Sequence, residues 1–430
     1  MTRKLLDDCF LHDKDRLTHH QAIDLLRNRI SPITGSEKIA LQDAVGRVVA
    51  SPIKTDNPIP GFDNAAVDGY AFSHSDYDME KGSIFQISGR AAAGHPLKSP
   101  PRPGTAIRIF TGAVVPPEFD SIVMQEDTEL IGNGDKDDNS ANARVSIPPG
   151  LKPGANRRRA GEDVKKNEQI FEPNHRIRAQ DLAAIASAGN GEVECFKRLK
   201  VAIFSTGDEI IRPGTPIEIG QVYDANAPML TGLIATTGAE CIDLGIIPDD
   251  ADIVEKTLRE AAEKYDVIIT SGGASRGEED YVVSTLDKIG KRHMWQIAVK
   301  PGRPMSMGQI NDTIFIGLPG NPVAVFVCFL LYAYPMLCRL GGTHWPEPRR
   351  FKVPADFQVP KKKTGRREFW RGYTRLENGN LKAHKFERDG SGLITSLRES
   401  NGLIEVGEDV SEIADGELVD FLPFSEFGIL

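Results

Sequence analysis

The chain has 430 residues, of which 40% are hydrophobic and 26% are charged. This length is more than one hydrophobic core usually serves, so we expect several domains. The 52 basic and 61 acidic residues give a net charge of -9, which argues against a general nucleic-acid binder or a membrane-surface protein. The five cysteines form no CxxC pair, so neither a disulfide framework nor a zinc site is indicated, and a reducing cytoplasm is the expected location.

The N-terminal part of the chain combines helical and strand-like patterns. Thr18 and Gln21 have the spacing of a capping box and precede apolar residues at helical spacing, which predicts an amphipathic helix. From 45 to about 147, short apolar runs separated by Pro and Gly clusters predict a small β-rich domain. A second helical pattern covers 178–188. We expect the two separated helical pieces to pack together as one discontinuous domain.

The second half of the chain predicts two further domains. From 199 to about 340, strands alternate with helices, which is typical of a parallel sheet. The apolar run Val323–Tyr334 is too short to span a bilayer and predicts a buried helix. After about 349 short alternating strands return. The predicted division is therefore a discontinuous helical domain (1–44 and 155–196), a β-rich domain (45–154), an α/β domain (197–345) and a C-terminal small β-barrel (346–430).

Acidic residues follow three predicted strands of the α/β domain. One strand, at 267–269, first enters a Ser-Gly-Gly turn, in which glycine lets backbone N–H groups approach an anionic ligand. Ligands of open α/β sheets bind outside the carboxyl ends of the strands, where these groups would gather. Carboxylates repel a phosphate unless a cation lies between them, and magnesium fits best. The residues concerned are Ser271, Gly272 and Gly273 in the turn, and Glu209, Asp249 and Asp280 among the carboxylates.

The alternative interpretation of this segment is an ordinary strand-to-helix turn that binds no ligand. Acidic residues in the first turn of a helix commonly complement the helix dipole without binding any ligand. Three acidic segments that follow three strands favour a phosphate-and-metal site over that reading.

A second candidate anion site comes later in the same domain. In GLPGNPVAVF, Asn321 and Pro322 suit the start of a helix whose N–H groups point toward the strand ends. A well-capped core helix explains both residues equally well, but it does not explain Pro319, which costs a backbone donor. Just upstream, Lys300 and Arg303 lie beside two prolines, which suits an oxyanion held at fixed geometry, although exposed basic residues near turns are commonly only solvated.

Two loops of the β-rich domain are also candidates. GFDNAAVDGYAF carries Asp68 in a stretch that is neither helical nor cleanly alternating, and RIFTGAVVP ends a strand at Thr111 and Gly112. Loops of this kind tend to hold binding residues, although either could be only a tight turn.

Read in order, the chain contains the motifs FDNAAVDGYA, RIFTGAVVP, AGEDV, STGDEI, LGIIPDD, SGGASRGEEDY, VKPGRP and GLPGNPVA. Together they resemble the molybdopterin molybdenumtransferase family, known as MoeA and as the E domain of gephyrin, over nearly the whole chain. The resemblance implies a molybdopterin-binding fold for the α/β domain. It also implies ligation of molybdenum from molybdate into adenylylated molybdopterin, with release of AMP and a divalent cation such as Mg²⁺.

The resemblance also assigns residues. It places Asp68, Thr111, Glu209, Asp249 and Asp280 in an acidic set, of which Asp280, Asp249 and Glu209 would hold the magnesium. Around the oxyanion it places Lys300, Pro319, Pro322, Arg371 and Ser391, of which the last two are identified by the resemblance alone. Gln296 stands where the family frequently has a lysine, so the oxyanion pocket would carry one positive charge fewer.

The resemblance finally implies partners and leaves two alternatives. The family forms an elongated homodimer in which one subunit's β-rich domain covers the other's sheet, so each site would be shared, and the product would be handed to molybdoenzymes or to other cofactor-biosynthesis proteins. One alternative is a molybdopterin adenylyltransferase, which resembles residues 199–340 only. The other is a non-catalytic scaffold, since the gephyrin E domain also binds receptor peptides.

Overall fold

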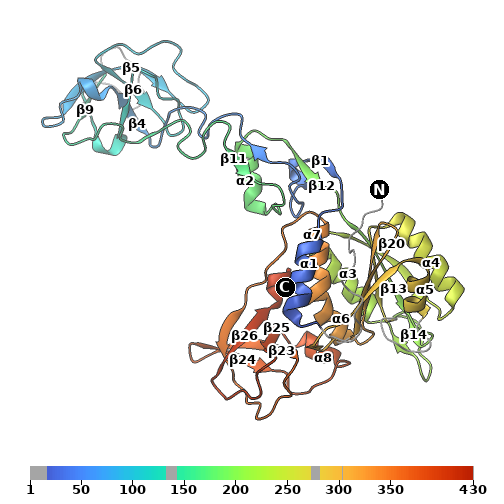
Figure 1. The fold of residues 1–430 in the computed structure, drawn as a ribbon. Helices are drawn as coiled ribbons and strands as arrows, with labels where there is room; N and C mark the ends of the chain where they lie inside the picture. The colour runs from blue at the N-terminus through green and yellow to red at the C-terminus, as the bar shows by residue number, and fades with distance from the viewer. Residues whose placement is uncertain (1–16, 132–142, 273–280, 303, 430) are drawn as a thin grey trace.

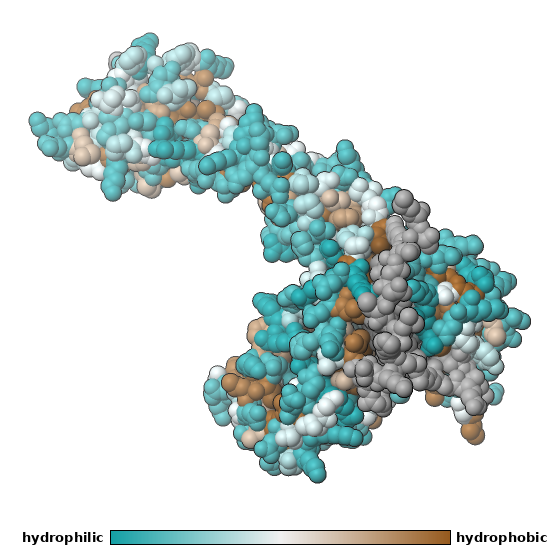
Figure 2. All heavy atoms as spheres, viewed as in Figure 1, coloured by the Kyte–Doolittle hydropathy of each residue, from teal (hydrophilic) through white to brown (hydrophobic). Residues whose placement is uncertain are grey.

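The computed structural model describes residues 17–131, 143–272, 281–302 and 304–429. The molecule is elongated, with a β-rich domain at one end and a helix-flanked sheet beside a second β domain at the other (Figure 1). The visible surface is largely hydrophilic (Figure 2), as expected when apolar residues are collected into separate cores.

The first helix, α1 (His19–Arg29), begins at the predicted capping box. Thr18 Oγ1 accepts a hydrogen bond from the Gln21 N–H, and Gln21 Oε1 accepts one from the Thr18 N–H. The buried residues Ala22 and Leu26 belong to the large core of the α/β domain.

The second helix, α2 (Ala179–Ser187), packs elsewhere. Its residue Ile185 lies in a small core with Val49 and Cys195. The prediction that the two helices pack together was therefore wrong, because α1 buries its apolar stripe against the larger apolar surface of the α/β domain. The chain does return on itself here, since β1 (Ser36–Ala40) pairs antiparallel with β12 (Glu192–Phe196). The domain boundaries drawn from the sequence stay predictions.

Short strands and single-turn helices complete the middle region and its links. β11 pairs with β2 and β10 pairs with β3, both antiparallel. The elements are β2 (Ile53–Lys54), β3 (Asn64–Ala65), β10 (Arg157–Arg158), β11 (Gln169–Phe171), η1 (Leu41–Asp43), η2 (His74–Asp76), η3 (Gln125–Asp127) and η5 (Phe424–Phe427).

The β-rich domain contains a six-stranded sheet in the order β7-β4-β6-β5-β9-β8, in which only β5 and β6 pair in parallel. Gly69 on β4 is required by close packing, since a Cβ there would lie 1.8 Å from the Val123 carbonyl oxygen. The strands are β4 (Gly69–Phe72), β5 (Ser83–Ala91), β6 (Thr105–Ile109), β7 (Ser121–Met124), β8 (Glu129–Ile131) and β9 (Arg144–Ile147).

The α/β domain is built on a six-stranded sheet in the order β16-β13-β17-β21-β20-β18. The first four strands of this order run parallel, as the sequence predicts, whereas β20 pairs antiparallel with β21 and β18 pairs antiparallel with β20. The strands are β13 (Lys200–Thr206), β16 (Glu240–Ile247), β17 (Val267–Ser271), β18 (Lys291–Gln296), β20 (Pro304–Ile310) and β21 (Thr313–Leu318), with a small pair β14 (Ile210–Ile211) and β15 (Val222–Tyr223) outside.

Helices cover both faces of this sheet. α4 (Ala251–Lys264) and α5 (Tyr281–Ile289) pack over one face, and α3 (Asn226–Thr236) lies in the core of the other. The chain reverses direction across the sheet beside β13, because β16 lies on one side of β13 and β17 on the other. Such a reversal opens a crevice at the carboxyl ends of the strands.

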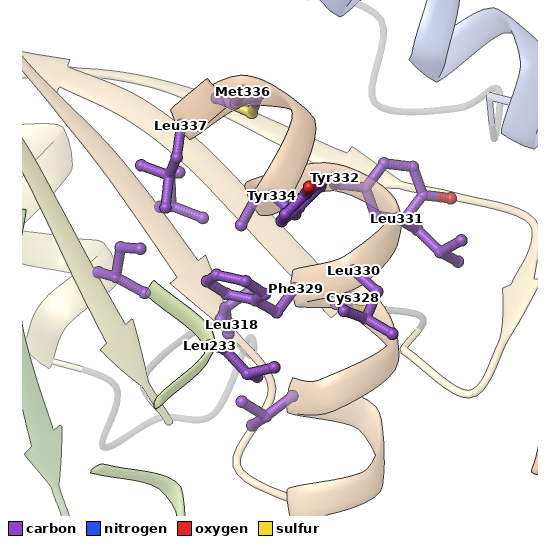
Figure 3. Packing of buried hydrophobic residues seen from close by; sticks show 14 of the residues in the cluster. Leu233, Leu318, Cys328, Phe329, Leu330, Leu331, Tyr332, Tyr334, Met336 and Leu337 are labelled. Carbon is purple, nitrogen blue, oxygen red and sulfur yellow. The ribbon is translucent and has the colours of Figure 1, made fainter. Parts of the chain in front are cut away.

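A long buried helix fills the core between the sheet and the rest of the molecule (Figure 3). It consists of α6 (Pro322–Cys328), a π-helical stretch η4 (Phe329–Ala333) and α7 (Tyr334–Leu340). Its 19 residues are long and apolar enough to cross a membrane, but 94% of its apolar window is buried inside the protein. It is therefore a core helix, as predicted, although it is longer than the apolar run suggested.

The C-terminal domain is mainly β, with the short helix α8 (Ile394–Arg398). Its strand order is β19-β23-β25-β26-β22, with β24 paired to the other part of β23. An isolated parallel bridge between Ala355 and Ala383 connects the segment after β22 with β24. The strands are β19 (Val299–Lys300), β22 (Phe351–Pro354), β23 (Arg367–Glu377), β24 (Asn380–Lys385), β25 (Gly402–Val406) and β26 (Leu418–Pro423).

Candidate functional site at the sheet edge

The glycine turn lies at the reversal of the sheet. Ser271, the last residue of β17, pairs in register with Ser205 of β13, and their hydroxyl oxygens are 3.4 Å apart. Gly272 follows with φ +94°, and its N–H donates to the Leu318 carbonyl at 3.1 Å. A side chain at Gly272 would be strained and would press on Thr206 Oγ1 at 3.3 Å. Gly273 and Asp280, which complete the predicted loop, lie outside the described residues.

Two of the predicted acidic segments meet beside this turn. The Asp249 N–H donates to a carboxylate oxygen of Asp208 at 3.3 Å, so the loops after β16 and β13 are in contact. The Glu209 carboxylate folds back over Gly207, where a Cβ would lie 2.4 Å from Glu209 Oε2. Glu209 and Asp249 are both exposed, and carboxylate oxygens are the ligands that magnesium prefers. Their chemistry therefore fits the predicted metal.

Within the described part of the chain, three potential metal ligands converge elsewhere. Asp356, Glu377 and His384 of the C-terminal domain bring one ligand atom each within 4.8 Å of one another. Lys382 forms ion pairs with both carboxylates, at 2.7 Å and 3.8 Å, which identifies this group as a salt-bridge cluster. It contains none of the predicted site residues.

The predicted cation Lys300 is anchored by a buried carboxylate that the sequence analysis missed. β19 pairs in parallel with β23, which places Lys300 beside Glu368, and Lys300 Nζ lies 3.6 Å from Glu368 Oε2. Glu368 also accepts hydrogen bonds from Trp370 Nε1 and Arg366 Nε, both at 2.9 Å. Burial raises the pKa of Glu368, but these donors and Lys300 outweigh it and leave the pKa below its usual range. Glu368 is therefore held as an anion.

Arg371, on β23, is connected to the start of the long helix through the loop at 390–391. Its Nε donates to Ser396 Oγ at 3.0 Å and its Nη2 to the Gly390 carbonyl at 3.1 Å. Burial lowers its pKa, and Asp389 partly offsets this effect. The neighbouring Ser391 carbonyl accepts the Val323 N–H at 3.1 Å, so the loop 390–391 is clamped between Arg371 and α6.

Asp389 shows that the two predicted cations share one environment. Burial raises its pKa, whereas a hydrogen bond from Lys385 and the charges of Lys385, Lys300 and Arg371 lower it, with a net lowering. Lys300 pairs in register with Glu368, three residues before Arg371 on β23, and the loop at 390–391 connects Arg371 with the start of α6. Arg303 lies outside the described residues.

The start of α6 differs from the prediction in one respect. Asn321 occupies the N-cap position, and its carbonyl accepts the Val325 N–H at 2.9 Å, but its side chain makes no capping hydrogen bond. The Val323 N–H is already occupied by Ser391, so the helix offers fewer free donors to an anion than the sequence predicts. The preceding loop lies against the β17 turn, since a Cβ at Gly320 would make an ordinary 3.9 Å contact with Gly272 Cα.

Asn226 is a further residue that the sequence analysis missed. Its Nδ2 donates to the Gly320 carbonyl at 2.8 Å, which fixes the loop between β21 and α6. Its Oδ1 is buried, and no described residue donates a hydrogen bond to it. The sequence signal that could have found it is Asp224 two residues earlier, whose carboxylate accepts the N–H groups of Asn226 and Ala227 at the start of α3.

Asp68 and Thr111 form a pair of their own. Asp68 Oδ1 accepts hydrogen bonds from the Thr111 N–H at 2.8 Å and from Thr111 Oγ1 at 2.7 Å, and these bonds lower the pKa of Asp68. Both residues belong to the β-rich domain, which lies at the opposite end of the molecule from the sheet (Figure 1). A single chain therefore does not bring this pair to the sheet edge.

One large cavity, of about 650 Å³, lies where α6 meets the C-terminal domain. Apolar side chains such as Phe326, Leu381 and Phe424 line it. It includes none of the predicted site residues.

Comparison with known proteins shows which family this architecture belongs to. The fold is that of a multidomain protein built around a probable molybdopterin-binding domain, whose family description matches residues 202–339. The flanking segments 17–189 and 352–424 match the MoeA N-terminal region (domain I and II) and the MoeA C-terminal region (domain IV). The chain belongs to the molybdopterin molybdenumtransferase (MoeA) family.

Individual relatives agree with this membership. A molybdopterin molybdenumtransferase from Haemophilus influenzae is 35% identical over 411 residues, which cover 95% of this chain and 99% of the relative. A gephyrin from Dictyostelium discoideum is 30% identical over 75% of this chain and 49% of its own length. The crystal structure of a molybdopterin biosynthesis MoeA protein from Pyrococcus horikoshii OT3 matches with a TM-score of 0.79 and 29% identity, over 95% of this chain and all of that one. The predicted multidomain fold is thereby confirmed.

Proposed function

We propose that this protein inserts molybdenum from molybdate into adenylylated molybdopterin and releases AMP, in the biosynthesis of the molybdenum cofactor. The observation that carries this proposal is the contact between two differently charged regions at the sheet reversal. The glycine turn after β17 is in contact with the loop that leads to α6. Exposed carboxylates lie beside the glycine turn. The anchored cations Lys300 and Arg371 lie beside the loop that leads to α6. One crevice can therefore take a nucleotide-bearing pyrophosphate and an oxyanion side by side.

In the acidic half of the proposed site, Glu209 and Asp249, together with Asp280, would hold Mg²⁺ against the pyrophosphate. A bound cation neutralises charge between carboxylates and phosphates and polarises the phosphoanhydride that breaks when AMP leaves. The glycine turn lets backbone N–H groups come close to the phosphates.

In the basic half, Lys300 and Arg371 would hold the molybdate dianion near the dithiolene sulfurs. Both cations are fixed by partners of the chain itself, Glu368 for Lys300 and Ser396 for Arg371. Fixed placement of two reactants supplies much of the rate, and no protein nucleophile is required.

AMP release tests the proposal. Purified protein is incubated with adenylylated molybdopterin, molybdate and magnesium, and free AMP is measured. We expect release that requires molybdate and is lost with EDTA, and we expect Asp280→Asn to remain folded without releasing AMP. Normal turnover by that variant would reject the metal assignment. ATP-dependent adenylylation of molybdopterin would instead support an adenylyltransferase, and peptide binding without turnover would support a scaffold.

We further propose a cytoplasmic homodimer in which each site is shared between subunits. Free thiols at the described cysteines Cys195, Cys241, Cys328 and Cys338 are compatible with a reducing compartment. The separation of Asp68 and Thr111 from the sheet of their own chain supports sharing, since a second chain could supply them. Handover of the product to molybdoenzymes or to other cofactor-biosynthesis proteins belongs to the same proposal.

A further inference from the structure

Two arginines lie next to each other at the β-rich end of the molecule. Arg90 on β5 and Arg108 on β6 are direct partners in the parallel register of these strands. Both guanidinium groups lie over the ring of Phe110, at 4.5 Å and 4.8 Å from its centroid. Like charges on adjacent positions of neighbouring strands repel each other, and stacking on one ring offsets only part of that repulsion.

The described residues supply no ion pair for either arginine. Arg108 donates to the Gly69 carbonyl at 3.3 Å and to Gln125 Oε1, and its buried Nε has no hydrogen-bond partner in the described part of the chain. The charges of Asp68 and Glu126 both interact with that of Arg108, but Asp68 Oδ1 already accepts two hydrogen bonds from Thr111, and Glu126 Oε1 accepts one from Gln125 Nε2. Arg90 is exposed. The two guanidinium groups therefore lie side by side without a direct ion pair among the described residues.

We propose that Arg90 and Arg108 form a phosphate-binding site at the β-rich end. A guanidinium that stacks on an aromatic ring through its face can keep in-plane N–H groups for a ligand, and two N–H groups match two phosphate oxygens. The exposed Arg90 has such groups, whereas Nη1 and Nη2 of Arg108 each already donate one hydrogen bond, so Arg108 would offer only the second N–H of each nitrogen. An exposed arginine beside a partly buried one would present such donors from two directions. The shared chemistry is a phosphate or pyrophosphate group.

The position of this site connects it to the substrate. Arg108 precedes Thr111 by three residues, so the arginine pair adjoins the Asp68–Thr111 pair. If that pair reaches the sheet of a second subunit, the arginines would hold the pyrophosphate of the adenylylated pterin from the side opposite to the carboxylates. This assignment to the substrate rests on the proposed function, whereas the phosphate site itself rests on the geometry of the β-rich domain.

Calorimetric titration of the full-length protein with pyrophosphate tests the site. The buffer contains EDTA, so that binding through magnesium at the sheet edge is suppressed. We expect Arg90→Gln to weaken binding about tenfold, as the loss of a charge-assisted contact implies. The matched control is Arg102→Gln, which removes an exposed arginine of the same domain and should leave the affinity within about twofold.

A second variant tests whether binding depends on the guanidinium geometry of Arg108 and not only on its positive charge. Arg108→Lys keeps the charge but loses the planar fork, and we expect it to weaken pyrophosphate binding as well. Equal affinities of Arg90→Gln and Arg102→Gln, or no pyrophosphate binding by the unmodified protein in EDTA, would overturn the site.

Kinetics separate this inference from the proposed function. A raised KM for adenylylated molybdopterin in Arg90→Gln, with kcat kept, supports the assignment to the substrate. Weakened pyrophosphate binding with an unchanged KM would overturn that assignment and indicate free phosphate as the ligand. If the unmodified protein releases no AMP but binds pyrophosphate through Arg90, the proposed function fails while the phosphate site stands.

Discussion

The sheet edge and the β-rich end of the molecule both carry charged residues, but they hold them in different ways. At the sheet edge, Lys300 and Arg371 are fixed by the buried partners Glu368 and Ser396. At the β-rich end, the Asp68 carboxylate accepts hydrogen bonds from the exposed Thr111, and Arg90 lies exposed on an aromatic ring. The cations of the sheet edge are held by buried groups of the same chain, whereas Asp68 and Arg90 are held by contacts at the surface.

The strongest test of this comparison is complementation between subunits. Asp68→Asn and Asp280→Asn should each be inactive alone. In an equal mixture with free exchange, half of the dimers are mixed and each holds one intact site, so activity should return to about a quarter of the unmodified level. AMP release measures it, and native mass spectrometry confirms the exchange. Absence of recovery after confirmed exchange would contradict sharing.

Removal of a preorganised cation should have the next largest effect. Arg371→Met leaves Ser396 and the Gly390 carbonyl without their donor, and we expect kcat/KM for molybdate to fall about a hundredfold. Unfolding in urea should show a loss of about 1–3 kcal/mol from the unpaired buried groups. Arg375→Met, on the same strand but exposed, is the matched control. Near-normal kcat/KM in Arg371→Met would contradict its role at the oxyanion.

Removal of the carboxylate that pairs with Lys300 should reduce activity less than removal of a cation does. Glu368→Gln keeps the shape and can still accept from Trp370, but it no longer attracts Lys300 electrostatically. We expect the KM for molybdate to rise about tenfold while kcat changes little, because Lys300 loses a charge-assisted contact. Steady-state AMP release at varied molybdate measures this, with exposed Glu387→Gln as the control. An unchanged KM would show that Glu368 does not position Lys300.

The smallest expected difference compares one glycine from each region. Gly272 and Gly112 both have positive φ, at +94° and +79°. A Cβ at Gly112 would make an ordinary 3.7 Å contact with Ala93, whereas one at Gly272 would press on Thr206 at 3.3 Å. We therefore expect Gly112→Ala to cost about 1 kcal/mol for the backbone alone, and Gly272→Ala to cost about 2 kcal/mol. Chemical denaturation of both variants measures the difference, and equal costs would contradict the tighter packing at the sheet edge.

The sequence predicted most of the fold because its signals are local. The capping box at Thr18 and Gln21, the strand at 267–269 and the buried helix after Pro322 each depend on residues close together in the chain. The packing of α1 could not be predicted in the same way, because its apolar stripe fits any large apolar surface. Only the three-dimensional structure shows that the α/β core, and not α2, covers it.

The same distinction applies to the candidate site. Strand ends followed by acidic residues predicted that the loops carrying Asp208 and Asp249 meet. Glu368 could not be predicted, since a glutamate in a strand gives no sign that Lys300, 68 residues earlier, pairs beside it. Residues that act by contacting others across domains leave little trace in a single sequence.

The short strand β19 has a consequence for the integrity of the molecule. It belongs to the chain of the α/β domain yet hydrogen-bonds with β23, and Phe369, Leu403 and Leu422 of the C-terminal domain share a core with the long helix. A protease cut in the connecting segment 341–349 would therefore leave two fragments that stay bound to each other. The C-terminal domain is therefore attached to the α/β domain in two ways: covalently through the connecting segment, and non-covalently through the β19–β23 pairing and the shared core.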